Sequence, residues 1–317
     1  MSFPVFDLHC DTLSRLLGRK MDSFGSLLQN DGHISLHRAQ KLPGYAQCFA
    51  CFTTDLWEDK SPVSAVQSFE RQIVQFQREM NNHPDKIAPA YSASDVENNF
   101  EKGLMSGILT IEGPAGFGFD PALLSDLYNA GFRMTSLGWN EKNVLTGSNV
   151  TGGGLTDLGR EYVREAQKQG MIVDVSHISD EGFWGIMEIT EKPVIASHSN
   201  SREVHNHSRN LTDDMFSALC QTGGLAGINL YSAFLGENPD IDTVCDHIFH
   251  FLSIDPEGTH IALGGDLDGC DSLPTGFTGV DDYEAVARRL QERGLDDTVI
   301  RNIFWNNALG VMRKCCM

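Results

Sequence analysis

Hydrophobic residues occur along this chain mainly as short continuous runs, and polar or glycine-rich stretches separate one run from the next. Continuous apolar runs of strand length are typical of parallel strands buried on both faces, whereas a strand with one wet face alternates apolar and polar residues. The pattern predicts eight strands, at residues 5–11, 45–52, 104–111, 132–137, 171–176, 193–197, 225–230 and 261–264.

Helical periodicity fills the segments between these runs. The clearest case is 63–82, where apolar residues recur at steps of three or four: Val66, Phe69, Ile73, Phe76 and Met80. Further helices are predicted at 12–17, 125–131, 158–169, 281–293 and 297–312, and another begins after Thr212, a residue suited to capping a helix. Eight strands that alternate with helices predict an α/β fold in which a parallel sheet closes into a (β/α)8 TIM barrel.

The chain is predicted to form one domain because its composition does not change along its length. No composition break or linker divides the chain, so residues 1–317 are predicted to form a single barrel domain. An open, doubly wound sheet is the alternative architecture. The count of eight strands and the lack of a dinucleotide-binding fingerprint weigh against it.

The formal net charge of −19 narrows the classes of partner. Nucleic-acid binding needs clustered Lys and Arg, and anionic membranes repel an acidic surface, so neither partner is expected. No apolar run reaches the roughly 18 residues of a membrane span, and strand-like sequence from Val5 leaves no room for a signal peptide. Eight cysteines scattered through apolar segments are typical of a reduced, cytoplasmic protein. Cys48 and Cys51 are interpreted as core, because a strand puts them on opposite faces.

Potential metal ligands stand at the ends of five predicted strands. Taken singly, each has an ordinary explanation: a helix cap, a turn residue, or a histidine that fills a niche in the core. The C-terminal strand ends of a barrel converge on the face that carries its active site, so five such strands together predict a metal site. The candidates are His9, Asp11, Glu112, His177, His198 and Asp266. Nitrogen and oxygen ligands without thiolate suit Zn²⁺, with Mn²⁺ and Co²⁺ as alternatives.

The order of these motifs also resembles the membrane dipeptidase (renal dipeptidase) family of zinc peptidases. The similar pieces cover nearly the whole chain, in the order of the family, and are specific only in combination. They are Asp7-Leu8-His9-Cys10-Asp11, Ile111-Glu112-Gly113, Ile172-Val173-Asp174-Val175-Ser176-His177, Pro193-Val194-Ile195-Ala196-Ser197-His198-Ser199, Ser208-Arg209-Asn210-Leu211 and Gly264-Gly265-Asp266-Leu267-Asp268-Gly269.

The resemblance implies a barrel that holds two zinc ions. One ion would be bound by His9 and Asp11 and the other by His177 and His198, and Glu112 would bridge them. Arg209 would hold the C-terminal carboxylate of a dipeptide, and Asp266 would transfer protons. The chain looks like the cytoplasmic bacterial branch of the family, whose members are commonly dimers, so a homodimer is the assembly that the resemblance suggests.

One position departs from the family pattern. Animal members carry a histidine after the fourth strand that helps to hold the substrate near the scissile carbonyl. The aligned position here is Trp139, within Ser136-Leu137-Gly138-Trp139-Asn140. Polarisation of the carbonyl is then left to the metals or to Asn140, and the substrate range of the animal enzymes does not transfer to this chain.

The expected reaction is hydrolysis of a free dipeptide. Two ions roughly 3.5–4 Å apart lower the pKa of a bridging water towards about 7 and stabilise the attacked oxygen. In this hypothesis the hydroxide attacks the peptide carbonyl, and Asp266 takes a proton and returns it to the leaving amine.

Two other functions compete with a dipeptidase. One is another binuclear amidohydrolase of the lactonase or deaminase type on the same barrel. Such enzymes usually open with His-x-His and bridge their ions with a carboxylated lysine, whereas this chain has His9-x-Asp11 and Glu112. The other is a metal-binding scaffold without turnover, which would have no need of a proton carrier at Asp266.

Overall fold

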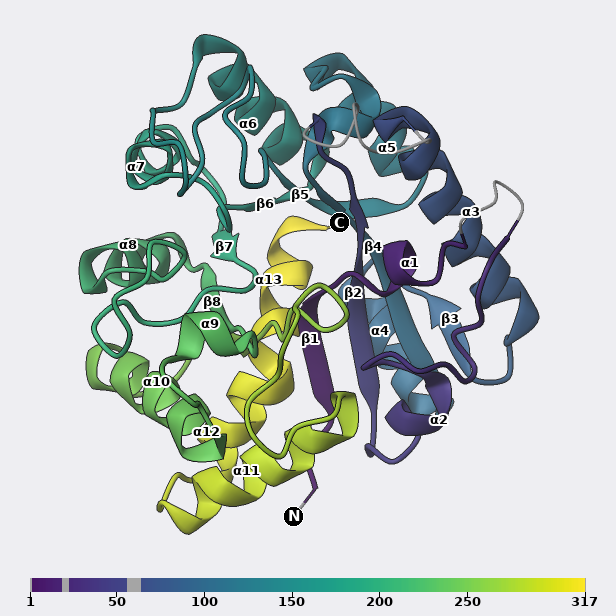
Figure 1. Cartoon of the computed structure of the whole chain (residues 1–317), viewed down its shortest axis with the longest axis vertical. Helices are drawn as coiled ribbons and strands as arrows, with labels where there is room; N and C mark the ends of the chain where they lie inside the picture. The colour runs from purple at the N-terminus through teal and green to yellow at the C-terminus, as the bar shows by residue number, and fades with distance from the viewer. Residues whose placement is uncertain (1, 19–22, 56–63, 317) are drawn as a thin grey trace.

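The chain folds into a closed barrel of eight parallel strands surrounded by helices (Figure 1). The computed structural model describes residues 2–18, 23–55 and 64–316. Neighbouring strands follow the order β2-β1-β9-β8-β7-β6-β5-β4, and the pairing of β2 with β4 closes the ring. The barrel strands are β1 Val5–Cys10, β2 Tyr45–Phe52, β4 Met105–Glu112, β5 Phe132–Ser136, β6 Ile172–Asp174, β7 Val194–Ala196, β8 Leu225–Ile228 and β9 Ile261–Leu263. The predicted fold class is confirmed.

The helices lie mainly outside the ring, in the places between strands where helical periodicity predicts them and in several others. The four shortest are α1 Thr12–Arg15, α2 Leu36–Ala39, α9 Ser232–Leu235 and α12 Asp297–Arg301. The longer ones are α3 Ala65–Asn82, α4 Ala93–Glu101, α5 Leu124–Asn129, α6 Asp157–Gln169, α7 Asp180–Met187, α8 Asp213–Thr222, α10 Ile241–Ile254, α11 Tyr283–Glu292 and α13 Asn307–Cys315.

Local capping sets several of these boundaries. Ser64 and Gln67 form a reciprocal capping box at the start of α3, and Val63, where the periodicity begins, lies outside the described residues. The predicted cap Thr212 accepts a hydrogen bond from the Met215 amide at the start of α8. Gly170 ends α6 in the left-handed conformation that glycine adopts without steric cost.

Helices α2, α4, α7, α9 and α10 were not predicted, and two further details differ from the predicted elements. A short strand, β3 Ile87–Pro89, pairs with β4 outside the ring and was not predicted. Three residues ending in proline are too few to give a strand pattern. The single helix predicted over 297–312 is interrupted by a π-helical turn, Asn302–Asn306, which separates α12 from α13.

Helix α13 closes the end of the barrel opposite the strand C-termini. Its residues Ala308, Leu309 and Met312 join a buried cluster with interior side chains such as Phe6 and Leu8. In Figure 1 it lies in yellow at the centre of the view, within the ring of outer helices. This end of the barrel is therefore filled mainly by apolar side chains, and the predicted ligands lie at the other end.

The cysteine pair in β2 and the apolar character of the helices bear on two further predictions. Cys48 belongs to the inner cluster and Cys51 to the outer one, so the two thiols lie on opposite faces of β2 as predicted. Within residues 2–18, 23–55 and 64–316, no helix combines the length and the apolar character needed to cross a membrane.

Candidate active site

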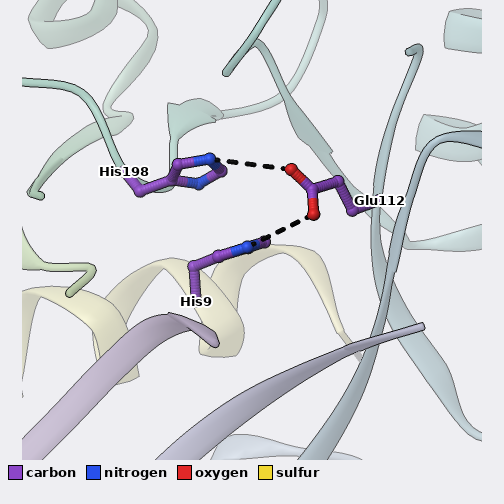
Figure 2. Close-up of side chains that lie close together, drawn as sticks. All are labelled: His9, Glu112 and His198. Atoms are coloured by element: carbon purple, nitrogen blue, oxygen red, sulfur yellow. Dashed lines mark ion pairs between the residues drawn. The ribbon is translucent and has the colours of Figure 1, made fainter. Parts of the chain in front are cut away.

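The predicted ligands converge at the C-terminal ends of the strands, and all of them are buried. His9 and Glu112 are the fifth residue of β1 and the last of β4, and His198 lies two residues beyond β7. Figure 2 shows their side chains pointing toward one another. His9 Nε2 lies 3.5 Å from Glu112 Oε2, and His198 Nε2 lies 3.8 Å from Glu112 Oε1. His177 Nε2 is closer still, 2.9 Å from Glu112 Oε1.

Glu112 thus divides the cluster into two halves. One carboxylate oxygen faces His9, whose Nε2 is also 3.3 Å from Asp11 Oδ2, and the other oxygen faces His177 and His198. Two sets of donor atoms lie close enough to hold an ion: one from His9, Glu112 and His198, the other from His9, Asp11 and Asp266.

The pairing of β1 is irregular at His9. The register of β1 on β2 shifts between Asp7 and Cys10, and an irregularity of this kind changes the direction of nearby side chains. The buried Asp7 carboxylate accepts hydrogen bonds from the His9 amide (3.0 Å), the Gly265 amide (3.1 Å) and the Tyr283 hydroxyl (2.5 Å). The irregular backbone is therefore held by a buried side chain of the same strand.

Two residues of the cluster, one from each half, have unusual backbone conformations. His177 and Asp266 have φ of 71° and 55°, in the left-handed region that non-glycine residues rarely occupy. Strain of this kind persists only where surrounding contacts enforce it, and it concentrates at functional sites. For His177, buried Asp174 supplies such contacts, accepting from the Ser176 amide and the Ser197 amide, both at 2.9 Å.

Hydrogen bonds to Nδ1 set the orientation of two histidines. His177 Nδ1 donates to Asn140 Oδ1 (3.0 Å), an acceptor only. His198 Nδ1 donates to Ser197 Oγ (2.7 Å), whose own hydroxyl donates to Asp174 Oδ2 (2.5 Å). Both Nε2 atoms then carry lone pairs, and they face each other at 3.0 Å. Two lone pairs at that distance repel unless a cation lies beside them.

Burial keeps these two imidazoles neutral. It lowers the pKa of His177 and of His198 well below the ordinary value, and the charges of Arg209 and His9 add to the effect. A neutral imidazole with a free Nε2 is the form that binds metal ions, and a hydrogen bond on the other nitrogen is the usual support for it.

Three carboxyl groups, those of Asp11, Glu112 and Asp266, are buried close together in the cluster. Burial, with help from the Asp11 and Asp266 carboxylates, raises the pKa of Glu112 to about 7, although His9 opposes it. Burial and Asp11 likewise raise the pKa of Asp266 to about 6. Asp11 Oδ1 is buried without a hydrogen-bond partner in the described part of the chain. Three buried carboxylates, one with an unsatisfied oxygen, fit divalent cations, so the residues present suit a metal centre.

Asp266 and Arg209 stand beside this cluster. Asp266 Oδ1 is 4.0 Å from His9 Nε2, and Asn229 Nδ2 donates to its other oxygen at 3.1 Å. Arg209 is 5% exposed, and among the described residues its guanidinium donates to Ser199 Oγ (3.3 Å) and the His198 carbonyl (3.4 Å), while Nε has no partner there. No carboxylate of the described residues forms an ion pair with this buried cation, so its guanidinium is available to an anion.

A cavity of about 260 Å³ opens above the cluster. Trp139 and Asn140 line it together with Asp11, Glu112, His177 and Asp266, so six of the nine predicted site residues surround one space, and His9, His198 and Arg209 are not among its lining residues. Its volume lies just below the roughly 300–1,000 Å³ of drug-sized sites, which suits a small ligand.

Three buried polar residues that hold the site were missed in the sequence: Asp7, Asp174 and Asn229. A signal existed for the first two, because each is a carboxylate inside an apolar strand, two or three residues before a histidine. Asn229 follows a strand without such a pattern, and its contact with Asp266 spans 37 residues.

A parallel barrel with histidines and carboxylates buried at its strand C-termini is typical of a metal-dependent hydrolase. Comparison with known proteins gives the family. Residues 1–316 match the family described as membrane dipeptidase, peptidase family M19, and the chain belongs to that family.

Individual relatives agree with this assignment. An uncharacterised dipeptidase of Schizosaccharomyces pombe is 33% identical over 264 residues, which are 81% of this chain and 64% of that protein, so the match spans less than two thirds of the yeast protein. Two solved structures share the fold with a TM-score of 0.88 and 24% identity. One is the M19 metallopeptidase dipeptidase AC, with 100% of this chain and 99% of that chain covered. The other is a Rhodobacter sphaeroides metallopeptidase bound to a phosphinate mimic of L-Ala-D-Ala, with 99% and 100% covered.

Proposed function

We propose that this protein is a binuclear zinc dipeptidase that hydrolyses the peptide bond of free dipeptides. The observation that carries the proposal is the position of Glu112, whose two carboxylate oxygens face His9 on one side and His177 on the other. A carboxylate with one oxygen directed at each of two ligand groups is suited to bridge two ions.

The ligands divide as the family resemblance implies. His9 and Asp11 would hold one ion, His177 and His198 the other, and Glu112 would be shared. Zinc is favoured because all the donors are nitrogen or oxygen and because burial keeps His177 and His198 neutral. When bound, such ions supply a hydroxide nucleophile at neutral pH and stabilise negative charge on the attacked oxygen.

Side chains around the centre supply the remaining functions. Asp266 would accept a proton and return it to the leaving amine; in support, Asn229 Nδ2 donates to one of its carboxylate oxygens and the other lies 4.0 Å from His9 Nε2. Arg209 is placed to bind the C-terminal carboxylate of the substrate, since its buried guanidinium has no anionic partner among the described residues. Asn140 orients His177 while it lines the cavity.

The cysteines support a cytoplasmic location, which we also propose. All eight are free, although several are close in sequence, and reduced thiols are typical of the cytoplasm. Homodimer formation stays a prediction from the resemblance, and light scattering would measure it.

The bridging role of Glu112 can be tested by metal analysis. The wild-type protein should contain close to two zinc ions per chain, and Glu112→Gln should lose both ions and dipeptide hydrolysis together, because an amide is a poor bridging ligand. Glu188→Gln is a control, since its exposed side chain pairs only with Arg160 at the surface. An active Glu112→Gln enzyme, or one ion per chain in the wild type, would contradict the binuclear assignment.

A further inference from the structure

The strand order places two groups of side chains on opposite sides of the barrel mouth. Phe52 ends β2 and Trp139 follows β5, so they flank β4. Arg209 follows β7 and Phe234 follows β8, about half a turn around the ring. In Figure 1, β2 and β4 lie to the right of α13 and β7 and β8 to its left.

The side near β2 and β5 is an aromatic wall. The rings of Phe52 and Trp139 pack edge to face with centroids 5.0 Å apart, and both line the cavity. Trp139 is only half-buried, so part of its ring faces the cavity space. The adjacent polar residue, Asn140, directs its carbonyl oxygen to His177. The surface offered here to a ligand is therefore mainly apolar.

The opposite side carries the positive charge. The Arg209 guanidinium lies 5.3 Å from the Phe234 ring, and Phe234 packs against Tyr231 at 4.8 Å. The metal ligands form the floor between the two sides. A ligand that reaches from Arg209 across Glu112 must continue toward Phe52 and Trp139.

The direction of a bound dipeptide follows, on the basis of the proposed function. Its C-terminal carboxylate lies at Arg209 and its scissile carbonyl lies over Glu112, and two extended residues span only about 7 Å. The N-terminal residue then extends toward β2 and β5. We propose that Trp139 and Phe52 form the subsite for the side chain of that residue, and that this subsite selects large apolar side chains.

Trp139 is the more informative residue to change, because its ring is only half-buried at the cavity whereas Phe52 is buried. The wild-type enzyme should prefer Phe-Ala and Leu-Ala to Gly-Ala by about tenfold or more in kcat/KM, the usual value of a buried apolar side chain. Trp139→Ala should reduce this preference to within about threefold, and Trp139→Phe should retain most of it. The ratio of Ala-Phe to Ala-Gly should stay the same in both variants, because the C-terminal side chain lies on the other side.

Tyr231→Ala provides the matched control, since it removes an aromatic ring from the opposite wall. It should keep the preference for a large N-terminal residue and alter only the series with a varied C-terminal residue. Zinc content is measured for every variant, because the Trp139 ring also lies 6.2 Å from that of His177. Retained zinc with an altered N-terminal preference supports the subsite.

Three outcomes would count against this account, and they separate failure of the subsite from failure of the proposed function. If the wild-type enzyme hydrolyses dipeptides with no N-terminal preference, or Trp139→Ala keeps the preference, the subsite assignment is wrong while the dipeptidase stands. If Trp139→Ala loses zinc and slows all substrates equally, Trp139 only supports His177 and the assignment is again wrong. If the zinc-loaded wild type hydrolyses no dipeptide, the proposed function itself fails.

Discussion

Two buried aspartates act alike on opposite sides of the barrel mouth. Asp7 accepts the amide of His9, two residues ahead, and the Gly265 amide beyond the neighbouring strand β9. Asp174 accepts the amide of Ser176, again two residues ahead, and that of Ser197 beyond β7. A buried carboxylate is tolerated only when its oxygens are hydrogen-bonded, and here those bonds fix the backbone just before a histidine.

Substitution of Asp266 separates metal binding from proton transfer. Asp266→Asn preserves shape but cannot accept a proton, so zinc content should persist while kcat for a free dipeptide falls by roughly 10²- to 10⁴-fold. Elemental analysis and steady-state kinetics on the same preparation give both values. Asp246→Asn, which removes an exposed carboxylate paired with Arg293, should leave kcat unchanged. Loss of zinc from Asp266→Asn would make Asp266 a ligand and contradict its role as proton carrier.

At the scale of elements, one histidine connects the loop that carries Arg209 to two helices. His247 on α10 accepts a hydrogen bond from the Ser201 amide at Nδ1 (3.1 Å), and its Nε2 donates to the Leu235 carbonyl at the end of α9 (3.0 Å). Both bonds are satisfied by the neutral imidazole alone. Burial accordingly lowers the pKa of His247 to about 4.

This contact predicts a pH dependence of stability with a definite sign. As pH falls below about 6.5, the unfolded chain protonates His247 first, so the free energy of unfolding decreases until the folded pKa near 4 is reached. The contribution is complete above pH 7 and loses roughly 2 kcal/mol by pH 5. Urea unfolding should show that the wild type loses about this much more stability between pH 7 and pH 5 than His247→Gln. Parallel losses in the two proteins would contradict the assignment.

At the scale of the molecule, the barrel was predictable because each of its strands is an apolar run long enough to stand out from its surroundings. The residues at the strand ends could then be predicted to form one metal site, because the C-terminal ends of barrel strands converge on one face. Helices α7 and α10 were not predicted although both have good caps, at Ser179 and Asp240. Their short or densely apolar sequences gave no clear polar face by which to recognise them.

The long-range hydrogen bonds that support the site could not be predicted from local sequence patterns. Asp7 meets Gly265 across 258 residues, and Asn140 meets His177 across 37. Such pairs follow from ring closure rather than from any neighbouring residues. The positive φ of His177 and Asp266 also leaves no trace in composition, because neither residue is a glycine. The sequence thus predicts which side chains meet at the mouth, and the folded chain determines how they are aimed.

The central claim is that this barrel mouth hydrolyses dipeptides with a free carboxylate, which Arg209 holds. The most direct test compares kcat/KM of the zinc-loaded protein for Leu-Ala and for the same dipeptide as its C-terminal amide. Truncating one side of a desolvated charged pair typically costs about 2–5 kcal/mol, so the acid should be favoured strongly, and Arg209→Met should lose at least about tenfold on the acid. Equal rates on acid and amide would contradict the account, and a broader amidohydrolase would take its place.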